Sequence, residues 1–114
     1  MTPLDIAKHY FQLSNESNLE DISRMFCENS TFRSGKNELF LGVKDIMAMQ
    51  HIHHGMYKKL RWHVKDVKEI KPGIIHFEFD FEGVTHSEEQ IAYSGMEDVI
   101  IYKGKIQHVQ VQRL

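Results

Sequence analysis

The first half of the chain has the hydrophobic spacing of helices. Apolar residues recur at steps of three and four over residues 4–14, which places them on one face of a helix. Thr2 precedes this run as a predicted N-cap, and Pro3 suits the first helical position. The same spacing predicts a short second helix over residues 19–26 and a third over residues 43–56.

The second half has the spacing of strands. From Lys58 onward apolar and polar residues alternate, and the clearest alternation runs over residues 75–82. Further strands are predicted over residues 90–102 and 106–113, and a four-residue turn at 34–37 predicts a short hairpin among the helices. The sequence therefore predicts an α+β fold, with three N-terminal helices wrapped around a cone-shaped, curved antiparallel sheet.

The composition is that of an ordinary globular domain. The chain has 114 residues, of which 41% are hydrophobic and 26% are charged, so we expect one domain over residues 1–114. The net charge of −2 lacks the basic excess of nucleic-acid binders. Cys27 is the only cysteine, which excludes an internal disulfide and fits a reducing compartment. No apolar run approaches the roughly 18 residues of a membrane span and no signal-peptide pattern is present, so we expect a cytoplasmic protein.

Four short motifs follow one another in order and cover nearly the whole chain. They are Tyr10-Phe-Gln-Leu-Ser-Asn15, Leu19-x-x-Ile22-x-x-Met25-Phe26, Phe40-x-Gly42-x-x-x-Ile46 and Glu97-Asp98-Val-Ile-Ile-Tyr102-Lys-Gly104-Lys105-Ile106. Together they resemble the nuclear transport factor 2-like superfamily and, within it, the SnoaL-like domains. The resemblance implies a cystatin-like cone with an internal cavity. It does not imply one activity, because this fold hosts isomerases, cyclases, dehydratases and binding domains.

A comparison with the ketosteroid isomerases suggests candidate catalytic residues. In that family a first-helix tyrosine and a protonated aspartic acid stabilise an enolate, and the resemblance puts these roles on Tyr10 and Asp98. The family's general base falls on Ser34, which cannot take up a proton at neutral pH. Asp98 shares a strand face with Met96 and Ile100, and if that face points inward, burial would raise its pKa and make it a hydrogen-bond donor. The alternative is a structural polar pair of Tyr10 and Asp98.

His53 is the candidate proton carrier. It lies one helical turn after Met49 on the apolar face of the third predicted helix; the alternative is a histidine that is only part of the core. His51 and His54 share a helix face, but no second ligand pair follows, so we expect no metal site. No glycine-rich nucleotide motif is present, so we expect no cofactor. The wall of the expected ligand pocket is formed by Phe32, Met49, Trp62, Ile75, Phe77, Phe79 and Arg113.

The opposite sheet face is polar but not strongly charged. It is predicted to carry His76, Glu78, Glu97, Val99, Ile101, His108, Gln110 and Gln112. In this superfamily the outer sheet face commonly forms a homodimer, so the resemblance implies a homodimer through this face. The alternative is a solvated surface.

Three functions stay open at this point. The first is acid–base chemistry of the isomerase, cyclase or dehydratase type on an apolar carbonyl compound, in which Tyr10 and Asp98 hold the oxygen and His53 carries the proton. The second is a non-catalytic domain that binds an apolar small molecule in the same cavity. The third is a protein-interaction domain whose cavity is filled by its own side chains. The sequence does not decide whether the protein is an enzyme.

Overall fold

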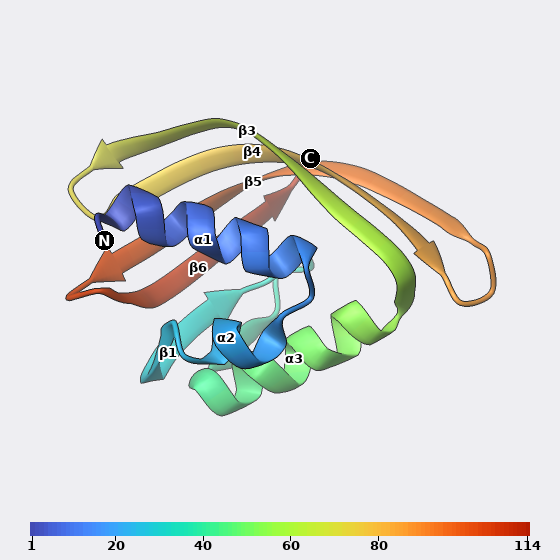
Figure 1. The fold of residues 1–114 in the computed structure, drawn as a ribbon, viewed down its shortest axis with the longest axis horizontal. Coiled ribbons are helices and arrows are strands. Elements are labelled where there is room, and N and C mark those ends of the chain that lie inside the picture. The colour runs from blue at the N-terminus through green and yellow to red at the C-terminus, as the bar shows by residue number, and fades with distance from the viewer.

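Six strands form one curved, mixed sheet in the order β2-β1-β6-β5-β4-β3. Figure 1 shows β3, β4 and β5 arching over helix α1 (Pro3–Asn15). The computed structural model describes all residues from 1 to 114. The strands are β1 (Phe26–Arg33), β2 (Leu39–Leu41), β3 (Tyr57–Lys71), β4 (Ile74–Thr85), β5 (Gln90–Tyr102) and β6 (Lys105–Arg113). Neighbouring strands are antiparallel except β1 and β6, which are parallel. The predicted α+β class with three helices is confirmed; the parallel contact that joins the hairpin to β6 was not predicted.

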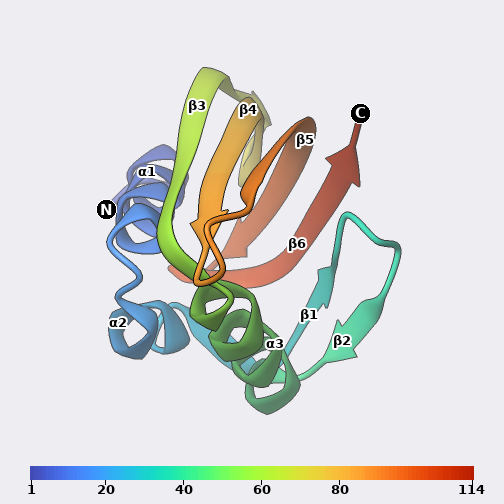
Figure 2. The same ribbon diagram turned by 90° about the vertical axis from the view of Figure 1, so that its right-hand side faces the viewer.

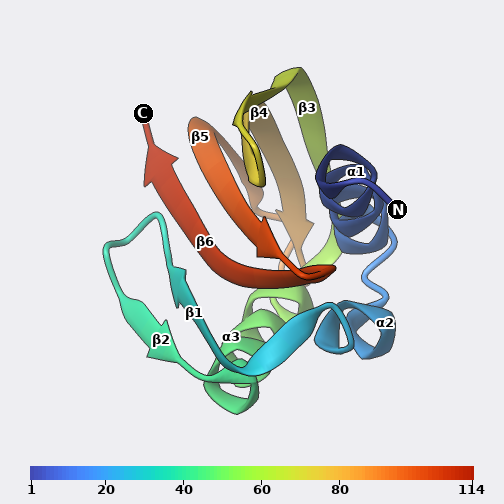
Figure 3. The ribbon, with the colours of Figure 1, turned by 90° about the vertical axis from the view of Figure 1, so that its left-hand side faces the viewer.

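Three helices cover the sheet on its concave side. They are α1 (Pro3–Asn15), α2 (Leu19–Ser23) and α3 (Val43–Gly55). Figure 2 shows α1 along β3 and β4, with α3 across one end of the sheet, and Figure 3 shows the β1–β2 hairpin beyond the β6 edge. The predicted cap of α1 is confirmed, because the Asp5 amide donates to Thr2 Oγ1 at 3.1 Å and the Thr2 amide donates to Asp5 Oδ2 at 3.2 Å. None of the helices combines the length and apolar composition needed to cross a membrane.

The second helix is shorter than predicted. It ends at Ser23, and Phe26 begins β1 beside Ile106 of β6. The Ile106 amide donates to the Met25 carbonyl at 2.8 Å, and the Ser30 hydroxyl donates to the Ile106 carbonyl at 2.6 Å. The apolar residues at helical spacing therefore belong partly to a strand, because pairing with a distant segment outweighs local preference.

The alternating apolar row of β4 forms the centre of the concave face. Phe77, Phe79 and Phe81 are almost fully buried there. β4 continues through Gly83 to Thr85, beyond the alternation that the sequence shows over residues 75–82. A side chain at Gly83 would lie 2.6 Å from the Tyr57 ring, so the glycine lets β3 and β4 approach closely at this end.

The predicted faces of β5 are reversed in the structure. Val99 is fully buried and Ile101 is 5% exposed, so both belong to the core and not to the outer face. The strand carries apolar residues on both faces, which makes its alternation ambiguous, and a register shift between Ile100 and Ile101 interrupts it further. Glu97 has the same parity as Val99 and also turns inward, opposite to its predicted position.

Candidate functional site

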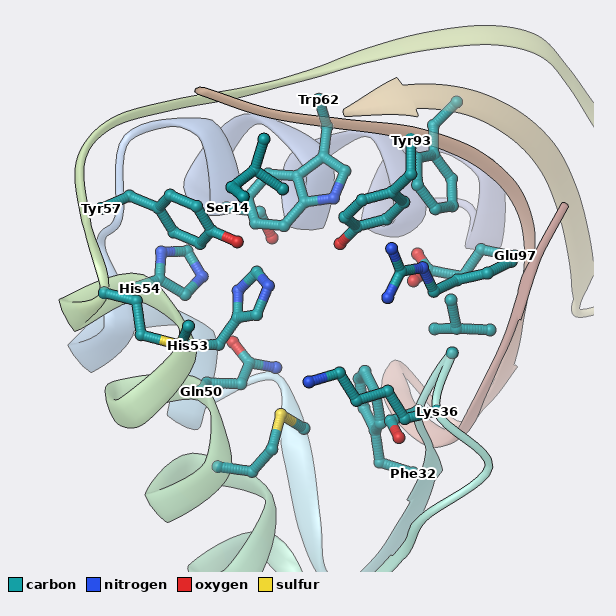
Figure 4. Close-up of a pocket in the computed structure, with 18 of the residues that line it drawn as sticks. Ser14, Phe32, Lys36, Gln50, His53, His54, Tyr57, Trp62, Tyr93 and Glu97 are labelled. Atoms are coloured by element: carbon teal, nitrogen blue, oxygen red, sulfur yellow. The ribbon is translucent and has the colours of Figure 1, made fainter. Parts of the chain in front are cut away.

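A cavity of about 500 Å³ lies between the concave face of the sheet and helices α1 and α3 (Figure 4). This volume falls within the range of about 300–1,000 Å³ found for small-molecule sites. Just over half of the residues that line it are hydrophobic. The predicted site residues that line it are Tyr10, Phe32, Met49, His53, Trp62, Phe77, Phe79 and Arg113.

Two predicted site residues do not reach the cavity. Asp98 lies on the outer face of β5, where its Oδ1 is 2.8 Å from Nδ1 of His76 on the neighbouring strand. The prediction failed because it took the apolar neighbours Met96 and Ile100 to mark the inner face. Ile75 is fully buried within the core and does not border the open space.

Glu97 occupies the inward position that was predicted for Asp98. It pairs in register with Phe77 on β4 and Val111 on β6, so apolar side chains flank it on the concave face. Burial, and to a lesser extent the charge of Asp98, raises the pKa of Glu97 from 4.5 to about 8. No side chain of the protein donates a hydrogen bond to its carboxyl group. The group is therefore mostly protonated at neutral pH and available to a ligand in the cavity.

Besides the Glu97 carboxyl group, the hydroxyl group of Tyr10 also lines the cavity. It is 4% exposed and lies on α1, where its ring meets Phe26 and Phe11 edge-on. Gln50 Nε2 on α3 donates to the Tyr10 hydroxyl at 3.4 Å. Burial raises the pKa of Tyr10, and the charge of Glu97 raises it further. The phenol therefore stays protonated and retains a proton to donate.

His53 faces the same space from α3. Its ring stacks on Trp62 with centroids 5.9 Å apart and lies 5.4 Å from the ring of Tyr57. Burial lowers the pKa of His53 below its usual 6.5, and the nearby charges of Lys36 and Arg113 lower it further. The imidazole is therefore neutral at pH 7 and able to accept a proton.

The neighbouring histidines have other positions. His54 is buried, and its Nδ1 lies 2.9 Å from the Ser17 hydroxyl after α1. Burial lowers the pKa of His54 to about 4, so it joins the helices as a neutral ring. His51 is exposed. No group of three or more histidine, cysteine or acidic side chains is arranged to hold a metal ion.

Comparison with known proteins gives similarity in structure alone. No protein-family model matches the sequence, and no curated protein sequence matches it. Among solved structures, an uncharacterised cystatin-fold protein from Novosphingobium aromaticivorans has a TM-score of 0.88 at 9% identity, covering 99% of both chains. A candidate SnoaL-like polyketide cyclase from Shewanella denitrificans has a TM-score of 0.87 at 12% identity, covering 98% of this chain and 90% of its own.

A third solved structure is a hypothetical protein with a ketosteroid isomerase-like fold from Catenulispora acidiphila, in complex with trimethylamine. It has a TM-score of 0.83 at 12% identity and covers 97% of this chain and 85% of its own. This chain has the nuclear transport factor 2-like fold. Identities this low fix the fold and leave the activity to the chemistry of the cavity.

Within the nuclear transport factor 2-like fold, the three positions compared with ketosteroid isomerase lie in different places. Tyr10 and Ser34 line the cavity, whereas Asp98 lies outside it. Glu97, one residue earlier, supplies the inward carboxyl. The chemical roles of these residues stay predictions.

Sequence reasoning missed several polar residues of the site. They are Glu97, Gln50, Lys36, Tyr57 and Tyr93. The sequence did carry a signal for the inner face of β5, because Tyr93, Gly95 and Glu97 lie at steps of two from Val99 and so share its face. A side chain at Gly95 would lie 2.6 Å from the ring of Phe79, so this glycine belongs to the face that meets the aromatic row.

Proposed function

We propose that this protein binds an apolar carbonyl compound in the cavity and moves a proton between a carbon atom next to the carbonyl group and His53. The observation that carries the proposal is the unpartnered Glu97 carboxyl inside the cavity, whose pKa is raised to about 8. Its counterpart is His53, whose pKa is lowered. Two groups whose environments displace their pKa values in opposite directions are typical of an acid–base pair.

The roles follow from the protonation states at neutral pH. Neutral His53 removes a proton from the carbon next to the carbonyl and becomes an imidazolium. Protonated Glu97 and the Tyr10 hydroxyl donate hydrogen bonds to the carbonyl oxygen, which carries the negative charge of the enolate. The imidazolium then returns the proton to carbon, at the same atom or at a conjugated one. The second outcome is an isomerisation, and no cofactor is required.

The proposal predicts a bell-shaped pH dependence. The rate should rise as His53 loses its proton below pH 6.5 and fall as Glu97 ionises near pH 8. Asp98 has no part in this scheme, because its carboxyl contacts His76 on the other face of the sheet. It therefore offers a matched control on the same strand.

The first test uses 2-naphthol, a planar phenol that resembles an enolate. We expect wild-type protein and Asp98→Asn to bind it equally, and Glu97→Met and Tyr10→Phe each to bind it at least about tenfold more weakly, or about 1.4 kcal/mol. Circular dichroism checks that each variant is folded. Absence of binding to the wild type would refute the proposed pocket function.

The second test detects proton transfer without a known substrate. 2-Tetralone is the ketone related to such a phenol, and exchange of its α-protons in D₂O is followed by NMR. Wild-type protein should accelerate the exchange over buffer, and His53→Ala should abolish the acceleration while retaining naphthol binding. Naphthol binding without exchange would instead support the second function, a non-catalytic ligand-binding domain.

The homodimer through the outer sheet face also stays a proposal. Val99 and Ile101 cannot contribute to this dimer interface, because both are buried in the core. Leu39 and Leu41 on β2 are 55% and 62% exposed, so they are the better candidates for a contact with a second copy. Sedimentation of wild-type protein and of Leu41→Lys tests this, with a single monomeric species for both as the contrary result.

A further inference from the structure

Two cationic side chains meet at the cavity from distant parts of the chain. Lys36 lies on the turn between β1 and β2, and Arg113 is the last residue of β6. Both line the cavity, and the charges of both act on His53. Figure 4 shows the Lys36 amino group directed across the opening toward Gln50 and His53.

Neither cation has an anionic partner in the protein. The ion pairs of the structure join other residues, such as Lys58 with Glu88 and Lys65 with Asp80. Glu38 and Glu89 also line the cavity, yet neither comes within ion-pair distance of Lys36 or Arg113. The cations are therefore free to contact a ligand.

Contacts on two sides hold the Arg113 side chain in position. Its guanidinium carbon lies 3.8 Å from the centroid of the Tyr93 ring, a stacking contact that leaves the edge of the guanidinium free for hydrogen bonds. On the other side, a Cβ at Gly35 would lie 2.5 Å from Arg113 Cγ. The β1–β2 turn can pack this closely only because residue 35 is glycine, so the turn that carries Lys36 lies against the Arg113 side chain.

We propose that the ligand carries a carboxylate, which Arg113 binds bidentately and Lys36 contacts, while the apolar body of the ligand extends into the cavity toward Glu97. This inference rests on the proposed function, because it names the substrate class of the same pocket: an apolar carbonyl compound with a carboxylic acid group. The planar guanidinium matches the two oxygens of a carboxylate. A single negative charge suits the opening better than a phosphate dianion, because Glu38 and Glu89 also line the cavity and lower the positive potential that the two cations produce.

The test compares two probes that differ only in the acid group, 2-naphthol and 6-hydroxy-2-naphthoate. Wild-type protein should bind the naphthoate at least about tenfold more tightly than naphthol. In Lys36→Gln/Arg113→Gln the ratio of the two dissociation constants, measured within that variant, should fall to less than about twofold. The control is Lys103→Gln, which removes an exposed cation from the β5–β6 hairpin and should leave the advantage unchanged.

Each other outcome has a distinct meaning. Equal binding of the two probes to the wild type overturns this inference but leaves the proposed function in place, provided that Glu97→Met still weakens naphthol binding. Failure of both probes to bind overturns both. Displacement of the naphthoate by inorganic phosphate at constant ionic strength would show selectivity for phosphate and would also overturn the carboxylate assignment.

Discussion

The substitution Glu97→Gln should change how the stability of the protein depends on pH. Folding raises the pKa of this carboxyl from 4.5 to about 8, so the folded protein holds the proton more tightly than the unfolded chain. The stability that this proton contributes is fully present below pH 4.5 and is lost as the pH rises through about 8. Glutamine has a similar shape and no such titration.

The magnitude follows from the two pKa values. At about 1.36 kcal/mol per pKa unit, the difference between 4.5 and about 8 corresponds to at most about 5 kcal/mol. Between pH 5 and pH 9 the wild type would lose about 4 kcal/mol of this relative to Glu97→Gln. Because the Glu97 side chain is only partly buried, we expect about half of that value, or roughly 2 kcal/mol.

Urea unfolding at pH 5, 7 and 9, followed by the fluorescence of the single tryptophan, Trp62, measures this difference. The free energy of unfolding of Glu97→Gln minus that of the wild type should grow steadily with pH. Most of the dependence due to Glu97 should persist in Asp98→Asn, since burial is a larger cause of the raised pKa than the neighbouring charge. A difference that changes by less than about 0.5 kcal/mol from pH 5 to pH 9 would refute the assignment of Glu97 as a protonated group in the cavity.

Three further substitutions test the packing of the sheet beside the cavity and the N-cap of α1. Gly95→Ala should destabilise the protein by about 1–3 kcal/mol in urea unfolding, because the new Cβ would lie 2.6 Å from Phe79; an unchanged midpoint would contradict this face of β5. Phe81→Ala removes a ring that is 1% exposed and should cost about 3–5 kcal/mol, measured in the same way, with a loss under about 1 kcal/mol as the contrary result. Thr2→Ala removes the cap of α1 and should cost about 1 kcal/mol, visible as a lower Tm, whereas an unchanged Tm would show that the cap contributes little.

Helices and strands were predictable where one face of an element is clearly apolar. The alternation of Phe77, Phe79 and Phe81 with acidic residues identified β4 and its inner face, and Thr2 with Asp5 identified the start of α1. β5 offers no such contrast, since Met96 and Ile100 on one face are as apolar as Val99 and Ile101 on the other. The register of β5 with β4 and β6 determines which of its faces points inward, and the local sequence does not specify this register.

The residues of the candidate site were likewise predictable only on elements with one clearly apolar face. Tyr10 on α1 and Phe77 and Phe79 on β4 line the cavity, because these elements have a clear inner face, whereas Ile75 on β4 is buried in the core. The inward carboxyl was assigned to the wrong residue because a shift of one position on a strand exchanges its faces. The placement of Lys36 and Arg113 at one cavity was beyond local reasoning, since 77 positions separate them. The parallel pairing of β1 with β6 and the packing of Gly35 against Arg113 bring the two segments to the cavity.

The distribution of charge in the cavity determines how a ligand would lie in it. At neutral pH the interior has little net charge, because burial keeps Glu97 mostly protonated and His53 neutral. The unpaired cations, Lys36 and Arg113, lie at the opening. An ionised group buried without a partner is costly, so a ligand with one charged end would keep that end beside the cations. Its neutral carbonyl would then point toward Glu97 and Tyr10, which is the orientation that proton transfer to His53 requires.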